Sequence, residues 1–305
     1  MNARVISIGD RRRDAVTAQR PVAAAAAPVA EPDIERVRRA LANSFTVLKT
    51  LESDSEVERY LARDLRGGTV QLKVLSTHAA GHARARELFY LEAQAASKLA
   101  HMNILANTNA EHAHGVDFCV VEHKQDARTL GDLLDRNGWL DATQAAQIAD
   151  QIASALDHAH MMGVLHLRLQ PECVLVEPDG WVTIADFGVE ANAGSERWKG
   201  PRVQYASPEL TRRATVDHRS DLYSLGALLY EMLTDRTPFD SNDAAYVSRR
   251  QVSFRPSPPH LISPDVPEAV SNVVMKLLDR EPAKRFASAA ALQAALDDAI
   301  SSSKN

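Results

Sequence analysis

Cysteine is scarce in this sequence, and it contains no long apolar run. The 305 residues include only two cysteines, Cys119 and Cys173, which cannot form a disulfide framework and are typical of a reducing cytoplasm. The most apolar stretch, residues 222–233, is short and interrupted by polar side chains, whereas a membrane span needs about 20 apolar residues. The sequence therefore predicts a cytoplasmic protein without a membrane span.

An excess of positive charge is also missing. The formal net charge is −5, and domains that bind nucleic acid usually carry a basic patch or a high isoelectric point. We therefore expect no nucleic-acid partner. Hydrophobic residues make up 45% of the chain and charged residues 25%. These values are ordinary for a globular protein that can bury a sizeable core.

The pattern of apolar residues changes along the chain. Short strand-like runs and one helical segment come first, and helices follow after about residue 125. Asp33 is a candidate cap for a short helix near the start. The expected divisions are a disordered tail rich in alanine, proline and arginine (1–32), a short helix or linker (33–44), a strand-rich lobe (45–123), a helical lobe (124–300) and a second tail (301–305).

Five short motifs occur in a fixed order. They are VQLKVL at 70–75, HLRLQPECVL at 166–175, DFG at 186–188, YASPE at 205–209 and DLYSLG at 221–226. In order and spacing they resemble the lysine strand, catalytic loop, metal-binding triplet, activation-segment end and supporting helix of protein kinases, with bacterial serine/threonine kinases as the nearest group. The resemblance covers residues 45–300. It implies an α+β fold with two lobes, a small β-rich N-lobe and a larger helical C-lobe.

Three positions keep the residues that the family uses to hold nucleotide. Lys73 corresponds to the phosphate-binding lysine, Glu92 to its helix partner and Asp186 to a magnesium ligand. The resemblance implies an ion pair between Lys73 and Glu92 together with one metal ligand. The same residues can equally be kept for architecture, because a lysine–glutamate pair also orients the helix.

Other positions have lost the residues of the family. Arg168 stands at the proton-acceptor position, Gln170 at that of a phosphate-contacting lysine, and Cys173 at that of the second magnesium ligand. An arginine has no acceptor lone pair and cannot be a general base, and a thiol suits magnesium poorly. We therefore expect no intact catalytic residue and no metal site, with Asp186 as the one residue that could contribute to a metal site.

The charge on Asp186 leads to a structural hypothesis. Without a metal ion, this carboxylate would lie unscreened in a partly closed site, which is costly unless it is paired. Arg168 can supply a charge-assisted bond, so we predict that it pairs with Asp186. The alternative is that Arg168 points to solvent.

The nucleotide-binding positions of the N-lobe are also altered. The segment 51–60 contains no glycine and four acidic residues, so its backbone cannot lie close over phosphates in the usual way. Gln71 and Arg59 replace the small apolar residues above the adenine, although a register shift of two would place Val57 there instead of Arg59. We therefore expect no cofactor, while ATP with magnesium is left open.

The residues that support the family's fold are present. Five positions match it: His166 and Phe187 of the internal stack, Asp221 as the anchor of the catalytic loop, and Glu209 with Arg285 as a buried ion pair. The sequence thus favours a pseudokinase, a regulatory or scaffolding domain that binds a protein partner without phosphoryl transfer. The alternatives are a divergent serine/threonine kinase with weak activity and an ATP-sensing module without turnover.

Overall fold

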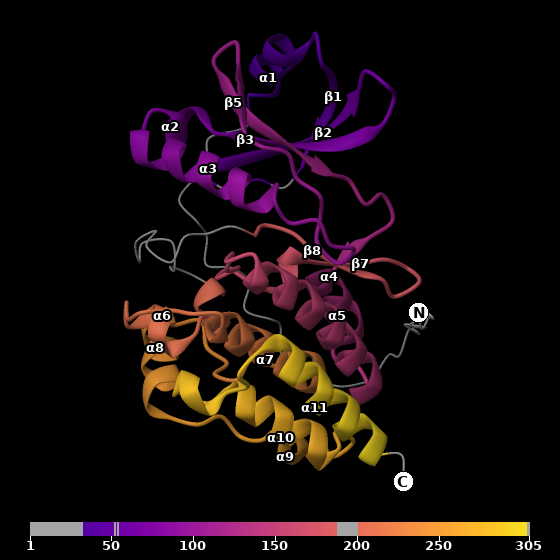
Figure 1. Cartoon of the computed structure of the whole chain (residues 1–305), viewed down its shortest axis with the longest axis vertical. Coiled ribbons are helices and arrows are strands. Elements are labelled where there is room, and N and C mark those ends of the chain that lie inside the picture. The colour runs from indigo at the N-terminus through magenta and orange to yellow at the C-terminus, as the bar shows by residue number, and fades with distance from the viewer. Residues whose placement is uncertain (1–32, 52, 54, 188–200, 304–305) are drawn as a thin grey trace.

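The structure is a computed structural model that describes residues 33–51, 53, 55–187 and 201–303. The chain forms a β-rich lobe and a larger helical lobe, one above the other in Figure 1. Both expected tails lie wholly or partly outside the described residues. At the C-terminal end, the last helix continues to Ser302, beyond the predicted end of the helical lobe at residue 300.

The N-lobe is an antiparallel sheet of five strands with helices beside it. Its strand order is β1-β2-β3-β5-β4. The elements are α1 (Ile34–Leu41), β1 (Phe45–Thr50), β2 (Val57–Asp64), β3 (Thr69–Leu75), α2 (Thr77–Ala80), α3 (Ala83–Ala96), β4 (Glu111–Ala113) and β5 (Val116–Glu122). The helix expected near the start is α1, and the Asp33 side chain accepts a hydrogen bond from the Arg36 N–H. Val37 and Leu41 of α1 pack on the sheet, against residues such as Tyr60.

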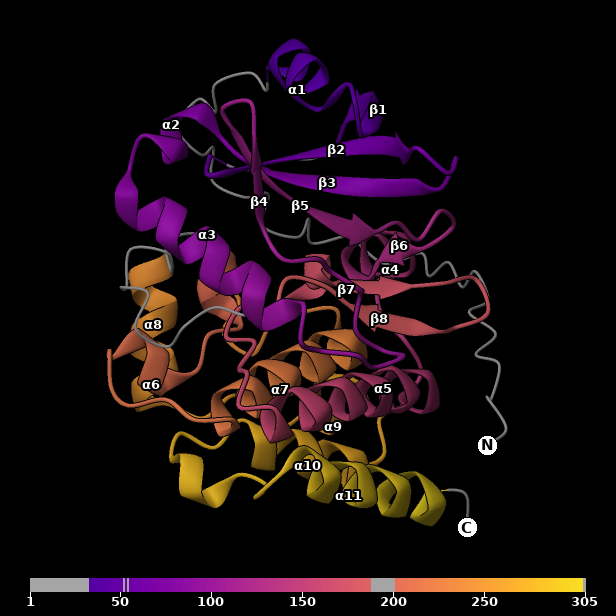
Figure 2. The same cartoon turned by 45° about the horizontal axis from the view of Figure 1, so that its top comes forward.

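The C-lobe is a group of helices with a small sheet at its top, facing the N-lobe (Figure 2). Its elements are β6 (Arg128–Thr129), α4 (Leu130–Asn137), α5 (Ala142–Met161), β7 (Val174–Val176), β8 (Val182–Ile184), α6 (Pro208–Thr211), α7 (Arg219–Thr234), α8 (Ala244–Ser253), α9 (Pro259–Ile262), α10 (Glu268–Leu277) and α11 (Ala289–Ser302). Within the described residues, no helix combines the length and the hydropathy that crossing a membrane would require.

The centre of the C-lobe is α7. All but one of its residues are buried, as expected for a helix that is apolar on most sides. At Gly226 an added Cβ would lie 2.6 Å from the Cβ of Leu277 in α10, so the two helices can approach this closely only because position 226 has no side chain. Helix α7 is thereby fixed against the base of the lobe, and its first turn supports the loops that face the N-lobe.

Candidate functional site

The candidate site lies between the lobes, where four segments meet. Strands β2 and β3 contribute Arg59 and Lys73, which are direct neighbours across the antiparallel ladder. Residues opposite each other in such a ladder project from the same face of the sheet. Helix α3 contributes Glu92, and the segment after β8 contributes Asp186. The alternative register with Val57 in the place of Arg59 is wrong, because Val57 lies opposite Leu75 at the end of β3.

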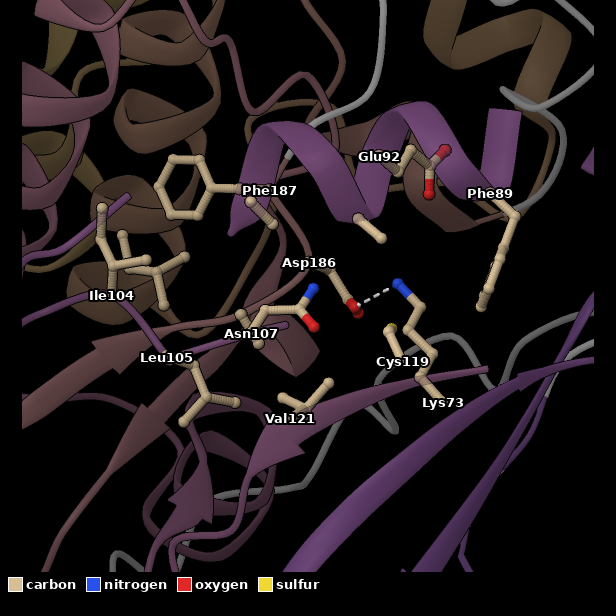
Figure 3. A pocket seen from close by; sticks show the side chains of 14 residues that line it. Lys73, Phe89, Glu92, Ile104, Leu105, Asn107, Cys119, Val121, Asp186 and Phe187 are labelled. Atoms are coloured by element: carbon tan, nitrogen blue, oxygen red, sulfur yellow. Dashed lines mark hydrogen bonds and ion pairs between the residues drawn. The ribbon is translucent and has the colours of Figure 1, made fainter. Parts of the chain in front are cut away.

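Asp186 is held by two cations from the N-lobe. Lys73 Nζ lies 3.0 Å from Oδ1 of Asp186, and Arg59 Nη2 lies 3.0 Å from Oδ2. The contact with Lys73 is the interaction drawn in Figure 3. Burial alone would raise the pKa of Asp186, but the charges of Lys73, Arg59 and Arg168 lower it well below its usual range. Asp186 is therefore ionised at neutral pH, and both of its oxygens already have positive partners.

Arg168 contacts Glu92 and not Asp186. Its Nη2 atom lies 3.5 Å from Oε2 of Glu92, and both side chains are largely buried. The predicted ion pair between Arg168 and Asp186 is therefore wrong, although the charge of Arg168 still lowers the pKa of Asp186. Its partner is different because Lys73 and Arg59 already hold both carboxylate oxygens of Asp186.

The predicted pair between Lys73 and Glu92 is also not found among the described residues. Figure 3 draws an interaction from Lys73 to Asp186 and none to Glu92. Lys73 and Glu92 do not pair because each has a different partner. Arg168 supplies the positive charge near Glu92, and Lys73 contacts the carboxylate of Asp186. The retained lysine and glutamate are thus both engaged in ion pairs, but not with each other.

The two remaining replaced positions lie below this charged cluster. Cys173 is buried, and its thiol lies 3.6 Å from the Arg168 carbonyl, to which it donates. Gln170 is half-buried beside Tyr205 and Ala206. Over the part of the chain that the structure describes, no group of three or more histidine, cysteine and acidic side chains is arranged to hold a metal ion.

The residues at this centre do not fit magnesium. Mg²⁺ is bound by oxygen ligands, and those of the kinase family include an aspartate and an amide. Here the carboxylate oxygens of Asp186 are engaged by Lys73 and Arg59. Cys173 offers sulfur at the second position, and Arg168 adds a further positive charge nearby. These five residues therefore favour an internal ion cluster over a divalent cation.

The supports below the site form a buried network around Asp221. Its carboxylate accepts hydrogen bonds from the backbone N–H groups of His166 (2.9 Å) and Leu167 (2.7 Å), and His160 Nε2 lies 2.8 Å from it. The His166 and Phe187 rings pack with centroids 4.6 Å apart. The loop that carries Arg168 is therefore anchored to α7, and Asp186 is positioned by its stacked neighbour.

A second buried support lies lower in the C-lobe. The Arg285 guanidinium makes two bonds to the Glu209 carboxylate, of 2.7 and 2.8 Å, and the Ser220 hydroxyl donates to the same carboxylate at 2.6 Å. Burial alone would raise the pKa of Glu209, but these bonds lower it. The pair joins α6 to the segment before α11.

The side of the site where adenine would bind is polar. Gln71 Nε2 lies 3.2 Å from Nδ1 of His123 in the segment that connects the lobes. In the segment before β2, the Ser53 hydroxyl accepts a hydrogen bond from the Arg59 N–H, and the Leu51 N–H donates to the Arg59 carbonyl. This segment therefore folds back on β2 through its own polar groups.

A small cavity lies behind Lys73. Its volume is about 20 Å³, and Lys73, Glu92, Cys119, Asp186 and Phe187 are among its lining residues (Figure 3). A space of this size holds about one water molecule. Burial raises the pKa of the Cys119 thiol to about 11, so this cysteine is protonated at neutral pH.

The structure brings together Lys73, Asp186, Glu92 and Arg168, which the sequence singled out, but the sequence missed the role of Arg59. It put Arg59 above the adenine position, whereas the side chain reaches Asp186 in the other lobe. The antiparallel register with Lys73 could have indicated that both cations share one face. No local signal in the sequence reveals that this face lies against Asp186.

Comparisons with known proteins agree with the two-lobed fold. The protein kinase domain family matches residues 54–296. The serine/threonine-protein kinase PrkC of Bacillus subtilis is 27% identical, over 87% of this chain and 42% of that protein. The serine/threonine-protein kinase pkn3 of Myxococcus xanthus is 32% identical, over 86% of this chain and 51% of that protein. The chain therefore spans about half or less of these relatives.

A solved structure shares the same fold. The crystal structure of the Mycobacterium tuberculosis PknI kinase domain superimposes with a TM-score of 0.69 and 25% identity, covering 85% of this chain and 96% of that domain. The small β-rich N-lobe and the larger helical C-lobe predicted from the sequence are confirmed, and the N-lobe sheet has five strands. With a family match over most of its length and this fold, the chain belongs to the protein kinase domain family.

Proposed function

We propose that this chain is a pseudokinase, a kinase-fold domain that binds a protein partner and does not transfer phosphate. The observation that carries the proposal is the cluster around Asp186. Lys73 and Arg59 engage the carboxylate that would otherwise hold magnesium, and Arg168 stands where the family has its proton acceptor. A guanidinium cannot take a proton from a substrate hydroxyl. The retained acidic and basic residues thus stabilise one another.

The size of the expected defect follows from the missing groups. General-base catalysis contributes about 10²–10⁴ to a rate, and metal and lysine contacts stabilise the charge that develops on the transferred phosphoryl group. Gln170 cannot supply the positive charge of the family's lysine. A site that lacks the general base, the metal contacts and the lysine contact at the same phosphate would accelerate phosphoryl transfer very little.

The second candidate is a divergent serine/threonine kinase. The names of the relatives favour it, because PrkC and pkn3 are both called serine/threonine-protein kinases. In this alternative, Lys73 and Asp186 separate when nucleotide enters and then take up their usual roles. Phosphate would come from ATP and pass to a serine or threonine hydroxyl.

Phosphate incorporation separates the two candidates. We expect the purified chain to incorporate no phosphate into itself or into a generic substrate, with magnesium or with manganese. Lys73→Met is the matched control, because it removes the side chain that an active site would use to hold phosphate. Incorporation that is present in the wild type and lost in Lys73→Met would establish the kinase.

A further inference from the structure

Arginine side chains gather around helix α8, away from the candidate site. Five of them, with two exposed aromatic residues, form what we call the arginine surface: Arg212, Arg213, Arg249, Arg250, Arg280, Tyr246 and Phe254. They come from α8, from the residues after α6, and from the residues after α10. Helices α6 and α8 lie side by side in both views (Figures 1 and 2).

Three contacts bring Arg212, Arg250 and Arg280 together at the C-terminal end of α8. Arg212 Nη2 donates to the Val252 carbonyl at 3.4 Å, and Arg280 Nη1 donates to the Ser253 carbonyl at 3.2 Å. The Arg250 guanidinium lies over the ring of Phe254, 4.0 Å from its centroid. Residues far apart in the sequence thus present their positive charges at one end of one helix.

These cations are not neutralised within the described chain. None of Arg212, Arg213, Arg249, Arg250 and Arg280 has a carboxylate within ion-pair distance among residues 33–51, 53, 55–187 and 201–303. The bonds from Arg212 and Arg280 to the end of α8 stabilise the helix. A guanidinium has five donors, and each of these two arginines uses one of them in its bond to the helix. Most of their donors remain available to a partner.

Three carboxylates of the neighbouring segments are engaged elsewhere. Asp243 caps the other end of α8 by accepting hydrogen bonds from backbone N–H groups. Asp279 pairs with Arg255 at 2.7 Å, and Glu281 pairs with Lys284 at 2.6 Å. The arginine surface is therefore a region of positive potential on a chain whose formal net charge is −5.

Exposed aromatic rings accompany this charge. Tyr246 is 40% exposed and Phe254 is 49% exposed. Tyrosine, phenylalanine and arginine are the residues enriched at protein interfaces. An arginine over an aromatic ring is also pre-organised to bind a carboxylate while the ring takes up an apolar side chain.

From these contacts we infer that the arginine surface binds an acidic segment of a partner protein, one that carries a large apolar side chain among aspartates and glutamates. This inference adds a binding surface and a class of partner to the proposed function. It rests on the proposed function in one respect, which is that the chain is a protein-binding module. Nucleic acid is the less suitable partner, because a net negative chain repels a long polyanion beyond the patch.

Helix α8 also connects this surface to the end of the activation segment. The Gln251 amide donates to the Val203 carbonyl at 2.6 Å, and the Gln204 amide donates to the Ser241 carbonyl just before α8. A partner bound on α8 would therefore lie next to the turn at 201–204. This position suits a segment that docks on the C-lobe without entering the cleft.

A peptide-binding experiment on the full chain tests the inference. The probe is a short fluorescein-labelled peptide of glutamate and aspartate around one phenylalanine, followed by fluorescence anisotropy. We expect wild type to bind it, and Arg249→Glu with Arg250→Glu to weaken binding about tenfold or more. The matched control is Arg63→Glu with Arg66→Glu, two exposed arginines of the other lobe, which changes the net charge equally and leaves affinity unchanged.

Four results would overturn the inference: no binding to wild type, undiminished binding to the reversed variant, an equal loss in the control variant, or displacement of the peptide by single-stranded DNA at lower concentration than by unlabelled peptide. Thermal unfolding of each variant verifies that it is folded.

Phosphate incorporation, measured in parallel, distinguishes a failure of the arginine surface from a failure of the proposed function. A chain that transfers phosphate and binds the peptide contradicts only the pseudokinase, and an inactive chain that ignores the peptide contradicts only the arginine surface.

Discussion

At the scale of single residues, charge balance in the cleft decides which partners each ionised group can have. Asp186 and Glu92 are two negative groups, and Arg59, Lys73 and Arg168 are three positive ones. Removing one partner from a group in this cluster weakens the pairing of a charge in a partly buried place, and such a loss can cost more than the intact pair contributes. The partner of each replaced residue therefore depends on the charges of its neighbours.

Arg59 gives the sharpest test at this scale. We expect Arg59→Met to lower the free energy of unfolding by about 1–2 kcal/mol, because Asp186 keeps only Lys73 as a direct partner. The methionine retains most of the apolar stem, so the loss reports mainly on the guanidinium. Urea unfolding at pH 7 measures it.

Arg63→Met on the same strand is the control, since Arg63 is exposed. We expect it to change stability by less than about 0.5 kcal/mol. Equal stability of Arg59→Met and wild type would contradict the view that Arg59 balances the charge of Asp186.

At the scale of elements, buried ion pairs fix helices and loops in place. Asp221 in α7 holds the loop with His166 and Leu167 through backbone N–H groups. Glu209 in α6 is held by Arg285, whose side chain also donates to the backbone carbonyls of Arg219 and Asp279.

The Glu209–Arg285 pair gives a pH-dependent prediction. The pKa of Glu209 is lowered in the folded chain, so its contribution to stability is fully present above the unfolded pKa of about 4.3 and is lost as the pH falls through the lower folded pKa. We expect Glu209→Gln to destabilise the chain by about 3 kcal/mol at neutral pH. The difference from wild type should shrink below about pH 4.

Chemical unfolding at several pH values measures this difference. Glu281→Gln is the control, because its pair with Lys284 is exposed and should contribute little at any pH. A difference between Glu209→Gln and wild type that grows as the solution becomes more acidic would refute the assignment.

At the scale of the whole molecule, the cluster joins the two lobes through direct ion pairs. Arg59 and Lys73 come from the N-lobe sheet, and Asp186 comes from the segment after β8. In an active kinase, nucleotide and metal ions would lie between these positions. The internal ion pairs provide that connection here, and a nucleotide would have to displace them.

Nucleotide binding therefore gives a prediction for the molecule as a whole. A ligand at 100 times its dissociation constant stabilises a protein by about 2.7 kcal/mol. We expect no such stabilisation by ATP at sub-millimolar concentration, with or without magnesium. Thermal unfolding of the full chain measures it, with Lys73→Met as the control for binding elsewhere.

A clear, magnesium-dependent rise in melting temperature that disappears in Lys73→Met would contradict this prediction. A rise without magnesium would support the ATP-sensing module instead. Either result bears on the cleft alone, since the arginine surface on α8 lies in another part of the C-lobe.

Local pattern was enough to predict most elements of the fold. The pattern of apolar residues predicted short strands and one helical segment before about residue 125 and helices after it, and β1, β3, β5, α3, α5, α7, α10 and α11 follow this order. The short elements β4, β6, α2, α4, α6, α8 and α9 were not foreseen. A helix or strand of a few residues has too little periodicity to indicate its type, and tertiary contacts decide it.

The sequence by itself determined the fold and the chemical identity of each group in the site, because motif order and residue type are properties of the chain. The partners were decided only by the tertiary structure. Arg59 and Asp186 are 127 positions apart, and Lys73 and Asp186 are 113 apart. Ion pairing depends on distance in space and on competition between nearby charges. For this reason Arg168 contacts Glu92, and the arginines around α8 form one surface.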